Sequence, residues 1–189
     1  MSWLNWENLK KACSQCNKCS LVQKRTNVVV GEGNPHARLM FIGEGPGADE
    51  DRTGRPFVGR AGQLLNTAIE AIGLKREDVY IANIVKCRPP GNRVPTEDEA
   101  KACIGYLRNQ VVLIKPKVIV CLGATAMKYV IDASARISKI RGQWVERKGY
   151  WIMATFHPAA LLRDESKKLP FWEDFKKVQE KLMLIKNEE

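Results

Sequence analysis

The chain has 189 residues, 44% of them hydrophobic and 28% charged, with 31 Lys and Arg against 21 Asp and Glu, a formal net charge of +10. This length and composition fit one globular domain with its own core, which we expect to span residues 1–189. No run of eighteen apolar residues and no signal-peptide pattern is present, so we expect a cytoplasmic, nucleoid-associated protein with no membrane partner. We also expect a monomer. The positive charge fits a solvated basic surface and a polyanionic partner such as nucleic acid equally well.

Apolar runs alternate with helical patterns along the chain. In chain order, we expect a helix at Trp3–Ala12, strands at Val28–Val30 and Arg38–Gly43, a helix at Ala61–Ile72, a strand at Val79–Val85, a helix from the capping box at Thr96 to Ile114, a strand at Lys117–Leu122, a strand pair at Gln143–Val145 and Trp151–Phe156, and a helix at Phe171–Ile185. Strands separated by helices predict a mainly parallel four-stranded sheet inside a three-layer α/β/α sandwich.

The loop after the strand at Arg38–Gly43 carries the strongest local signal. Residues 42–63 read IGEGPGADEDRTGRPFVGRAGQ, and the glycines allow a ligand to approach the backbone closely. Four acidic residues and the missing Lys-Ser/Thr ending make this a poor phosphate cradle. The loop therefore favours a ligand that offers hydrogen-bonding edges rather than anionic charge.

Three of the predicted parallel strands end in polar or otherwise distinctive residues. The first leads into Gly43-Glu44-Gly45, the second ends at Asn83, and the last runs into Phe156-His157-Pro158. The carboxyl ends of parallel strands converge on one crevice, so these residues should share a pocket. Taken alone, Asn83 is better explained by a turn cap and His157 by a structural role. Phe57, in the loop, can equally be ordinary core.

The six cysteines are unlikely to form disulfides, because the cytosol keeps thiols reduced. Cys13, Cys16 and Cys19 form a CxxCxxC run, whereas Cys87, Cys103 and Cys121 stand apart. A CxxC pair with two remote cysteines fits either zinc or an iron–sulfur cluster, although a zinc ribbon usually brings a second CxxC. Cys121 lies inside an apolar strand, where a small buried side chain is expected.

Three strings, GEGPGADEDRTGRPFVGRAGQLLN, IVKCRPPGNR and FHPAALL, follow the early CxxC in this order. Together they closely resemble the family 4 uracil-DNA glycosylases, iron–sulfur enzymes of thermophilic archaea and bacteria. The resemblance runs from Cys16 to about Arg163. It implies a DNA repair enzyme that flips uracil out of DNA and hydrolyses its N-glycosidic bond, leaving an abasic site.

The resemblance also implies roles for individual residues. His157 would donate a hydrogen bond to uracil O2, and the backbone N–H of Gly45 would donate to the same base. Asn83 would accept from N3–H and donate to O4, the reverse of what cytosine requires. Phe57 would stack on the flipped base. Glu50 would lie near the C5 edge, where it excludes the methyl group of thymine.

Two further sets of residues follow from the same resemblance. The loop lacks the Asp that positions water in better-known uracil glycosylases, which leaves Glu44 first, or Glu50, for that task. Leu161 or Leu162 would enter the DNA as a wedge, with Arg163 on a phosphate, while a helix start packed on the core explains either leucine equally well.

For the metal, the resemblance favours a [4Fe–4S] cluster on Cys16, Cys19, Cys87 and Cys103, which would act as a staple without a redox step. Cys13 and Cys16 offer a competing CxxC frame. The register of the following sequence against the family pattern favours Cys16 and Cys19, which leaves Cys13 as a bystander or an alternate ligand. Three rival functions stay open: a non-catalytic iron–sulfur module that binds nucleic acid, a small electron-transfer protein, and a related glycosylase with a broader lesion range.

Overall fold

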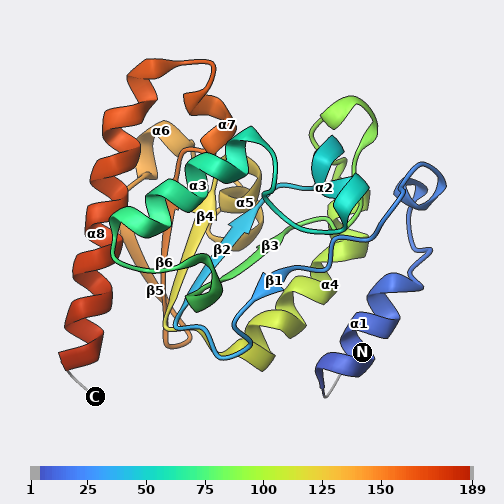
Figure 1. Cartoon of the computed structure of the whole chain (residues 1–189), viewed down its shortest axis with the longest axis horizontal. Helices are drawn as coiled ribbons and strands as arrows, with labels where there is room; N and C mark the ends of the chain where they lie inside the picture. Colours follow the sequence, from blue (N-terminus) through green and yellow to red (C-terminus); the bar gives the residue numbers. More distant parts are fainter. Residues whose placement is uncertain (1–4, 188–189) are drawn as a thin grey trace.

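The computed structural model describes residues 5–187, and its strands form one sheet in the order β1-β3-β2-β4-β6-β5 (Figure 1). The strands are β1 (Glu32–Gly33), β2 (Leu39–Gly43), β3 (Tyr80–Asn83), β4 (Val118–Leu122), β5 (Trp144–Arg147) and β6 (Tyr150–Thr155). The four central strands are parallel, while β1 and β5 pair antiparallel at the two edges. The predicted parallel core is therefore correct, and the sheet is larger and more mixed than predicted.

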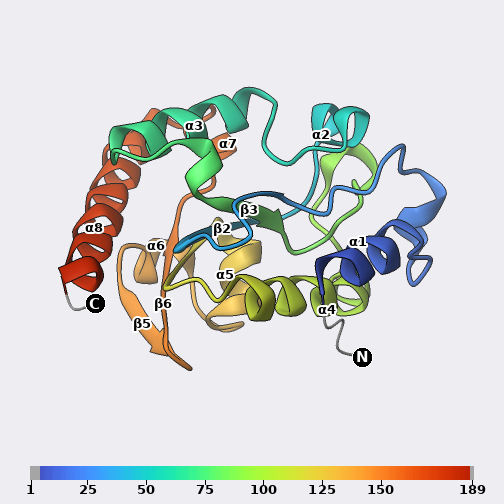
Figure 2. The same ribbon diagram turned by 60° about the horizontal axis from the view of Figure 1, so that its bottom comes forward.

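Helices cover both faces of this sheet (Figure 2). One face carries α1 (Trp6–Ser14), α4 (Glu97–Ile114) and α5 (Ala124–Val130), and the other carries α3 (Arg60–Ala71) and α8 (Lys168–Asn187). Short helices α2 (Ala48–Thr53), α6 (Ile137–Ile140) and α7 (Pro158–Leu161) and 3-10 turns at Ser20–Gln23, Arg76–Asp78, Pro90–Asn92 and Glu165–Lys167 lie in the connections. Within residues 5–187, no helix is long and apolar enough to cross a membrane.

The side chains of each central strand divide between two cores. In β2, Met40 and Ile42 pack towards α4 and α5, whereas Leu39 and Phe41 pack towards α3 and α8. A strand with helices on both faces is apolar at every position, which explains the uninterrupted runs in the sequence. The three-layer α/β/α arrangement is confirmed.

The order of the strands places the pocket. From β2 the chain passes to β3 on one side, and then returns to β4 on the other side of β2. The strand order therefore reverses between β2 and β4, and ligands of open α/β sheets bind at the carboxyl edge of such a reversal. The loops after Gly43, Asn83, Leu122 and Thr155 all leave the sheet at this edge.

Several predicted elements need correction. Val28–Val30 is not a strand; Val29 donates one hydrogen bond to the carbonyl of Lys86 (2.8 Å) and otherwise serves as core. The short strand β1 follows it, bounded by Gly31 and Gly33 in left-handed backbone. The acidic loop contains α2, and the last helix begins at Lys168 rather than Phe171. Of the first predicted helix, Trp3 and Leu4 lie outside the described residues.

A buried ion pair fixes the end of β6, the strand that leads to His157. The Asp174 side chain of α8 is fully buried and accepts from Arg141 Nε (2.9 Å) and Nη2 (2.7 Å). It also accepts from the hydroxyl of Thr155 (2.6 Å), the last residue of β6. Arg141 in addition lies over the ring of Phe156. The pair thus ties α8 and the α6–β5 connection to the strand end.

We predict that Arg141→Met destabilises the fold by about 3 kcal/mol, because the Asp174 carboxylate is left buried without its partner. The free energy of unfolding in urea measures the effect. Lys101→Met removes an exposed pair with Glu97 at 2.7 Å and serves as the control, with an expected change below about 0.5 kcal/mol. Equal effects of the two substitutions would contradict the prediction.

Candidate active site

Asn83, Phe57 and His157, distant in sequence, lie together at the carboxyl edge of the sheet. Gly43 of β2 stands opposite Asn83 of β3 in the register. A Cβ at Gly43 would lie 2.4 Å from Asn83 Oδ1 and 2.6 Å from Phe57 Cζ, so both side chains converge on this glycine. The Phe57 ring in turn stacks on the His157 imidazole, with centroids 5.5 Å apart and planes at 28°.

Asn83 carries an unusual polar atom. Its side chain is 1% exposed, and within the described chain its Oδ1 is buried without a hydrogen-bond partner. Buried polar atoms are nearly always paired in native proteins, so such an exception needs an explanation. An acceptor held ready for an N–H group of a ligand provides one.

The local structure fixes the tautomer of His157. The residue precedes α7, and its Nδ1 accepts from the backbone N–H of Ala159 at 3.1 Å. A neutral ring must then carry its proton on Nε2. Burial, with the nearby Arg163 charge, lowers the pKa of His157 to about 4, so the ring is neutral at physiological pH. Gly123 at the start of α5 has a φ of 93°, and a Cβ there would lie 2.9 Å from the His157 Cβ.

The acidic loop is held by its own carboxylates. Glu50 accepts from the backbone N–H groups of Gly47 (3.1 Å), Val58 (2.9 Å) and Gly59 (3.0 Å), which fixes the segments on both sides of α2. Glu44 is partly buried and accepts from the hydroxyl of Thr125 in α5. Gly45 passes so close to the loop after β3 that a Cβ would lie 2.7 Å from Val85 Cγ2.

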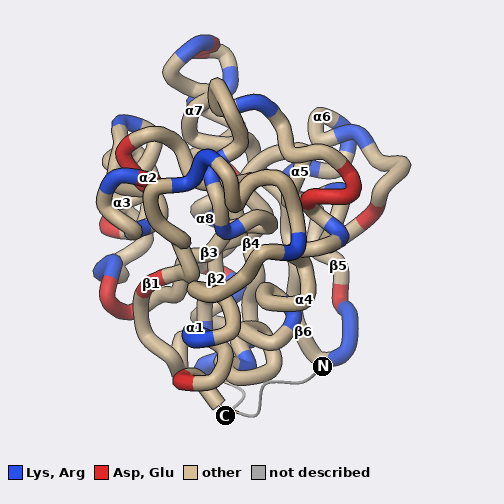
Figure 3. Tube along the Cα trace, turned by 90° about the vertical axis from the view of Figure 1, so that its right-hand side faces the viewer, with Lys and Arg blue, Asp and Glu red and all other residues tan. Residues whose placement is uncertain are grey.

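The segment around α7 separates the two candidate wedge residues. Leu161 is 1% exposed and belongs to the core, whereas Leu162 is 42% exposed and Arg163 is also exposed. A hollow of about 390 Å³ lies beside them between α3, α7 and α8. Lys and Arg positions occur on the segments around α7 and on the α2–α3 side of the same edge (Figure 3). This part of the molecule combines an exposed leucine with positive charge.

Five of the six cysteines line a second pocket, between α1, α4 and the loop after β3. They are Cys13, Cys16, Cys19, Cys87 and Cys103. Hydrogen bonds reach two of the sulfurs, from Arg25 Nη1 to Cys87 Sγ and from the Lys86 N–H to Cys103 Sγ, both at 3.3 Å. Among residues 5–187, no three His, Cys, Asp or Glu side chains are arranged to hold a metal ion. Cys121 is buried in β4, as predicted.

We did not predict from the sequence a residue that lines the cysteine pocket and also contacts Asn83. Lys86 is 1% exposed, and burial lowers the pKa of its ammonium group to about 8. Its Nζ donates to the carbonyl of Asn83 (2.9 Å) and to Gln110 Oε1 (2.7 Å). The available signal was a lysine between the apolar strand end and Cys87, in the string IVKCRPPGNR.

The fold, and a pocket at the carboxyl edge of the sheet where the strand order reverses, can be compared with those of known protein families. A family model described as the uracil DNA glycosylase superfamily matches residues 30–179, and the chain belongs to that superfamily.

Within the superfamily, the chain is similar to several type-4 uracil-DNA glycosylases. That of Thermotoga maritima is 50% identical over 165 residues, 86% of this chain and 86% of the relative. That of Sulfurisphaera tokodaii is 47% identical over 183 residues, covering 92% and 83%. That of Archaeoglobus fulgidus is 43% identical over 182 residues, covering 92% of both. The chain is therefore a member of the type-4 family, as the motifs indicated.

We predict that the His157 imidazole stays neutral, with its proton on Nε2, between about pH 5 and pH 8. The folded chain should take up this proton only near pH 4, whereas an exposed histidine does so near 6.5. As the pH falls from 6.5 to about 4, the unfolded chain binds this proton before the folded chain does. His157 should therefore lower the free energy of unfolding over that range. Nitrogen NMR of the imidazole, assigned with His157→Asn, measures the midpoint. A midpoint near 6.5 would refute the assignment.

Proposed function

We propose that this chain excises uracil from DNA by hydrolysing the N-glycosidic bond of deoxyuridine, which leaves an abasic site and free uracil. The observation that carries the proposal is the buried, unpaired Oδ1 of Asn83 beside the rings of Phe57 and His157. A flat base with an N–H group on its edge matches this combination. The names of the relatives agree with it.

Asn83 would read the base. Its Oδ1 accepts from uracil N3–H, and its amide nitrogen donates to O4. Cytosine offers an acceptor at N3 and a donor at N4, so it would leave the buried amide of Asn83 facing like groups. A buried polar mismatch of this kind discriminates strongly between substrates. Phe57 would stack on the face of the base, and Gly45 N–H would add a further donor.

His157 would promote bond cleavage. Breaking the bond leaves negative charge on uracil and positive charge on the sugar, so stabilising the departing anion accelerates the reaction. The Nε2–H of the neutral ring donates to uracil O2, and its bond strengthens as negative charge develops there. Because the ring starts neutral, it needs no prior loss of a proton.

The two acidic residues would divide the remaining work. Glu44 is our candidate for orienting the attacking water or offsetting the charge of the sugar cation. Its carboxylate accepts a hydrogen bond from the hydroxyl of Thr125 in α5, next to the point where the strand order reverses. Glu50 has its oxygens on three backbone N–H groups, which suits a residue that shapes the loop and the C5 side of the pocket.

DNA would be bound along the basic edge around α7. We assign the wedge to Leu162 rather than Leu161, because Leu161 is committed to the core and Leu162 is exposed. A leucine inserted into the stack fills the space left by the flipped nucleotide. Arg163 and the exposed Arg60 at the start of α3 are placed to meet phosphates.

The test uses a labelled single-stranded oligonucleotide with one dU, followed by alkali to break abasic sites. We expect cleavage at dU and none at dC or dT in the same position. His157→Ala should lower kcat by a factor of about 100 or more with little change in DNA affinity, because its hydrogen bond matters most in the transition state. An inactive wild-type protein refutes the proposal, and an equal loss of kcat and affinity removes His157 from its role.

We further propose that the cysteine pocket holds a [4Fe–4S] cluster on Cys16, Cys19, Cys87 and Cys103. The chemistry of the donors supports this, because thiolates bind such clusters and N–H groups point at two of the sulfurs. The cluster would span the pocket, since no three of the described side chains are arranged around a single metal ion. Bound there, the cluster would join α1 and its following segment to α4 and the loop after β3. Uracil hydrolysis transfers no electrons, so its contribution would be structural.

We predict that serine at any of these four positions lowers the iron content of the purified protein and its brown visible absorbance. Cys121→Ser, in β4, is the matched control and should keep about four irons per chain. Cys13→Ser decides between the two CxxC frames, and retained iron supports the assignment. If Cys13→Ser loses iron while Cys19→Ser keeps it, the alternative frame is correct.

A further inference from the structure

The backbone at Phe57 adopts a conformation that its side chain disfavours. Its φ is +50°, in the left-handed region that bulky residues rarely occupy. Such conformations persist only where the surroundings enforce them, and they concentrate at functional sites. The orientation of the Phe57 ring over Gly43 and against His157 depends on this backbone angle. Something must therefore hold the chain in place here.

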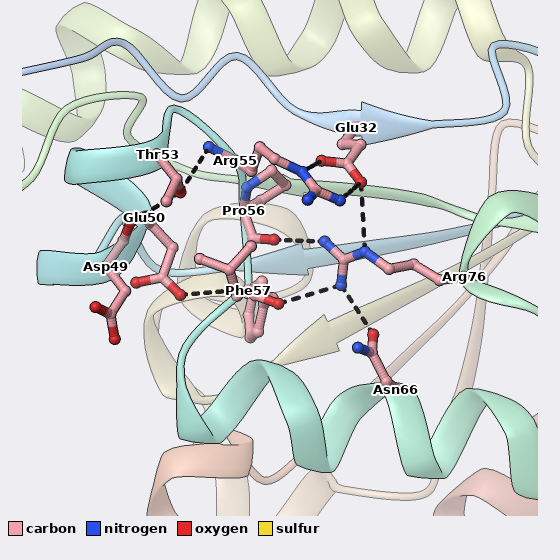
Figure 4. A network of polar contacts seen from close by, with 10 residues as sticks. Glu32, Asp49, Glu50, Thr53, Arg55, Pro56, Phe57, Asn66 and Arg76 are labelled. Carbon is pink, nitrogen blue, oxygen red and sulfur yellow. Dashed lines mark hydrogen bonds and ion pairs between the residues drawn. The ribbon is translucent and has the colours of Figure 1, made fainter.

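Arg76 provides the hold from one side (Figure 4). It lies in the 3-10 turn before β3, and its side chain is only 20% exposed. Its guanidinium donates to the carbonyl oxygens of Pro56 and Phe57, the latter at 3.2 Å, and to Asn66 Oδ1 at 2.9 Å. Arginine presents several N–H donors in a rigid plane, which suits it to bind several carbonyls at once.

The opposite side of the same turn is fixed by Glu50 and α3. Glu50 accepts from the next two N–H groups, those of Val58 and Gly59. At Gly62, a Cβ would lie 1.9 Å from the Phe57 carbonyl oxygen, so α3 presses directly on this peptide. The carbonyl oxygens of Pro56 and Phe57 thus accept from the guanidinium group of Arg76. The next two backbone N–H groups donate to the carboxylate of Glu50, so Phe57 is held from both sides.

Glu32 supplies a second layer behind Arg76. Its carboxylate accepts from Arg76 Nε at 3.5 Å and from Arg55 Nε and Nη2, both at 2.7 Å. Arg55 is 59% exposed and binds the outer side of Glu32. Replacing Arg55 therefore removes one positive charge from the same network without removing a bond to Pro56 or Phe57.

We propose that Arg76 is a positioning residue that holds the Phe57 ring ready to stack on the base, and so sets the affinity of the pocket for uracil. The inference rests on the proposed function of this site. A ring that stacks on the base contributes equally to the bound substrate and the transition state. Loss of such uniform binding raises KM and leaves kcat nearly unchanged. A residue that acts on the chemical step would instead lower kcat.

The test compares Arg76→Met and Arg76→Lys with the control Arg55→Met, using the single-dU oligonucleotide and free uracil as a competitive inhibitor. For Arg76→Met we expect KM and the inhibition constant of uracil to rise about tenfold or more, with kcat within about threefold of wild type. Arg76→Lys should fall between, because an ammonium group binds fewer carbonyls. Arg55→Met should stay within about twofold of wild type in every constant.

A second measurement observes the ring itself, independently of turnover. The chain is labelled with 4-fluorophenylalanine, and the Phe57 fluorine resonance is assigned by its loss in Phe57→Leu. In Arg76→Met this resonance should shift or broaden, and it should remain in place in Arg55→Met. If Arg76→Met does not fold, Arg76→Lys carries both measurements.

The outcomes separate the two proposals. An unmoved fluorine resonance, or a fall in kcat at constant KM, overturns the positioning role of Arg76. A wild-type protein that releases no uracil overturns the proposed function instead. In that case the fluorine spectra alone decide whether Arg76 holds Phe57.

Discussion

The pairing of β2 with β3 sets Gly43 opposite Asn83, and the geometry of the pocket depends on this single register. A slip by one residue would turn every side chain of the strand to the other face of the sheet. The absence of a side chain at Gly43 leaves the space that the Asn83 amide and the Phe57 ring occupy. Strand pairing and one missing Cβ therefore bring together groups that come from three separate parts of the chain.

Lys86, which lines the cysteine pocket, also contacts Asn83 of the candidate active site. The backbone N–H of Lys86 reaches Cys103 Sγ, and its Nζ reaches the carbonyl of Asn83. Gln110, which accepts from the same Nζ, donates in turn to the carbonyl of Val30 and to the hydroxyl of Tyr80. A buried ammonium group is stable only where such acceptors surround it. The loop after β3 is thus fixed both to the cysteine pocket and to Asn83 at the end of β3.

Much of this architecture was predictable because its causes are local. The central strands β2, β3, β4 and β6 read as apolar runs. The capping box at Thr96 begins α4 as expected, with Glu99 and Thr96 exchanging hydrogen bonds. The prediction of a strand at Val28–Val30 was wrong, because three apolar residues in a row fit a strand and a loop that packs on the core equally well. Its isolated bond to Lys86 arises from tertiary packing, which periodicity does not record.

The residues of the candidate site also differ in how well the sequence predicts them. The motifs predicted that Asn83, Phe57 and His157 share a pocket, and the structure brings these three side chains together. The contacts of the Arg76 side chain could not be predicted from the sequence, because they are made with backbone carbonyls of a turn about twenty residues earlier in the chain. The sequence also could not show which of Leu161 and Leu162 is exposed. These adjacent residues at the end of α7 face different surroundings, and only the structure shows that Leu161 packs in the core.

Glu99 joins the cysteine-bearing segment to the rest of the fold, and this has a consequence for acid tolerance. Its carboxylate accepts two bonds from Arg93, both at 2.8 Å, and one from Ser20, the neighbour of Cys19. The hydrogen bonds from Arg93 lower the pKa of Glu99 from 4.5 to about 2. The stability it confers is full above pH 4.5 and vanishes only as the pH falls through about 2. In acid, this contact should therefore persist until the pH approaches about 2.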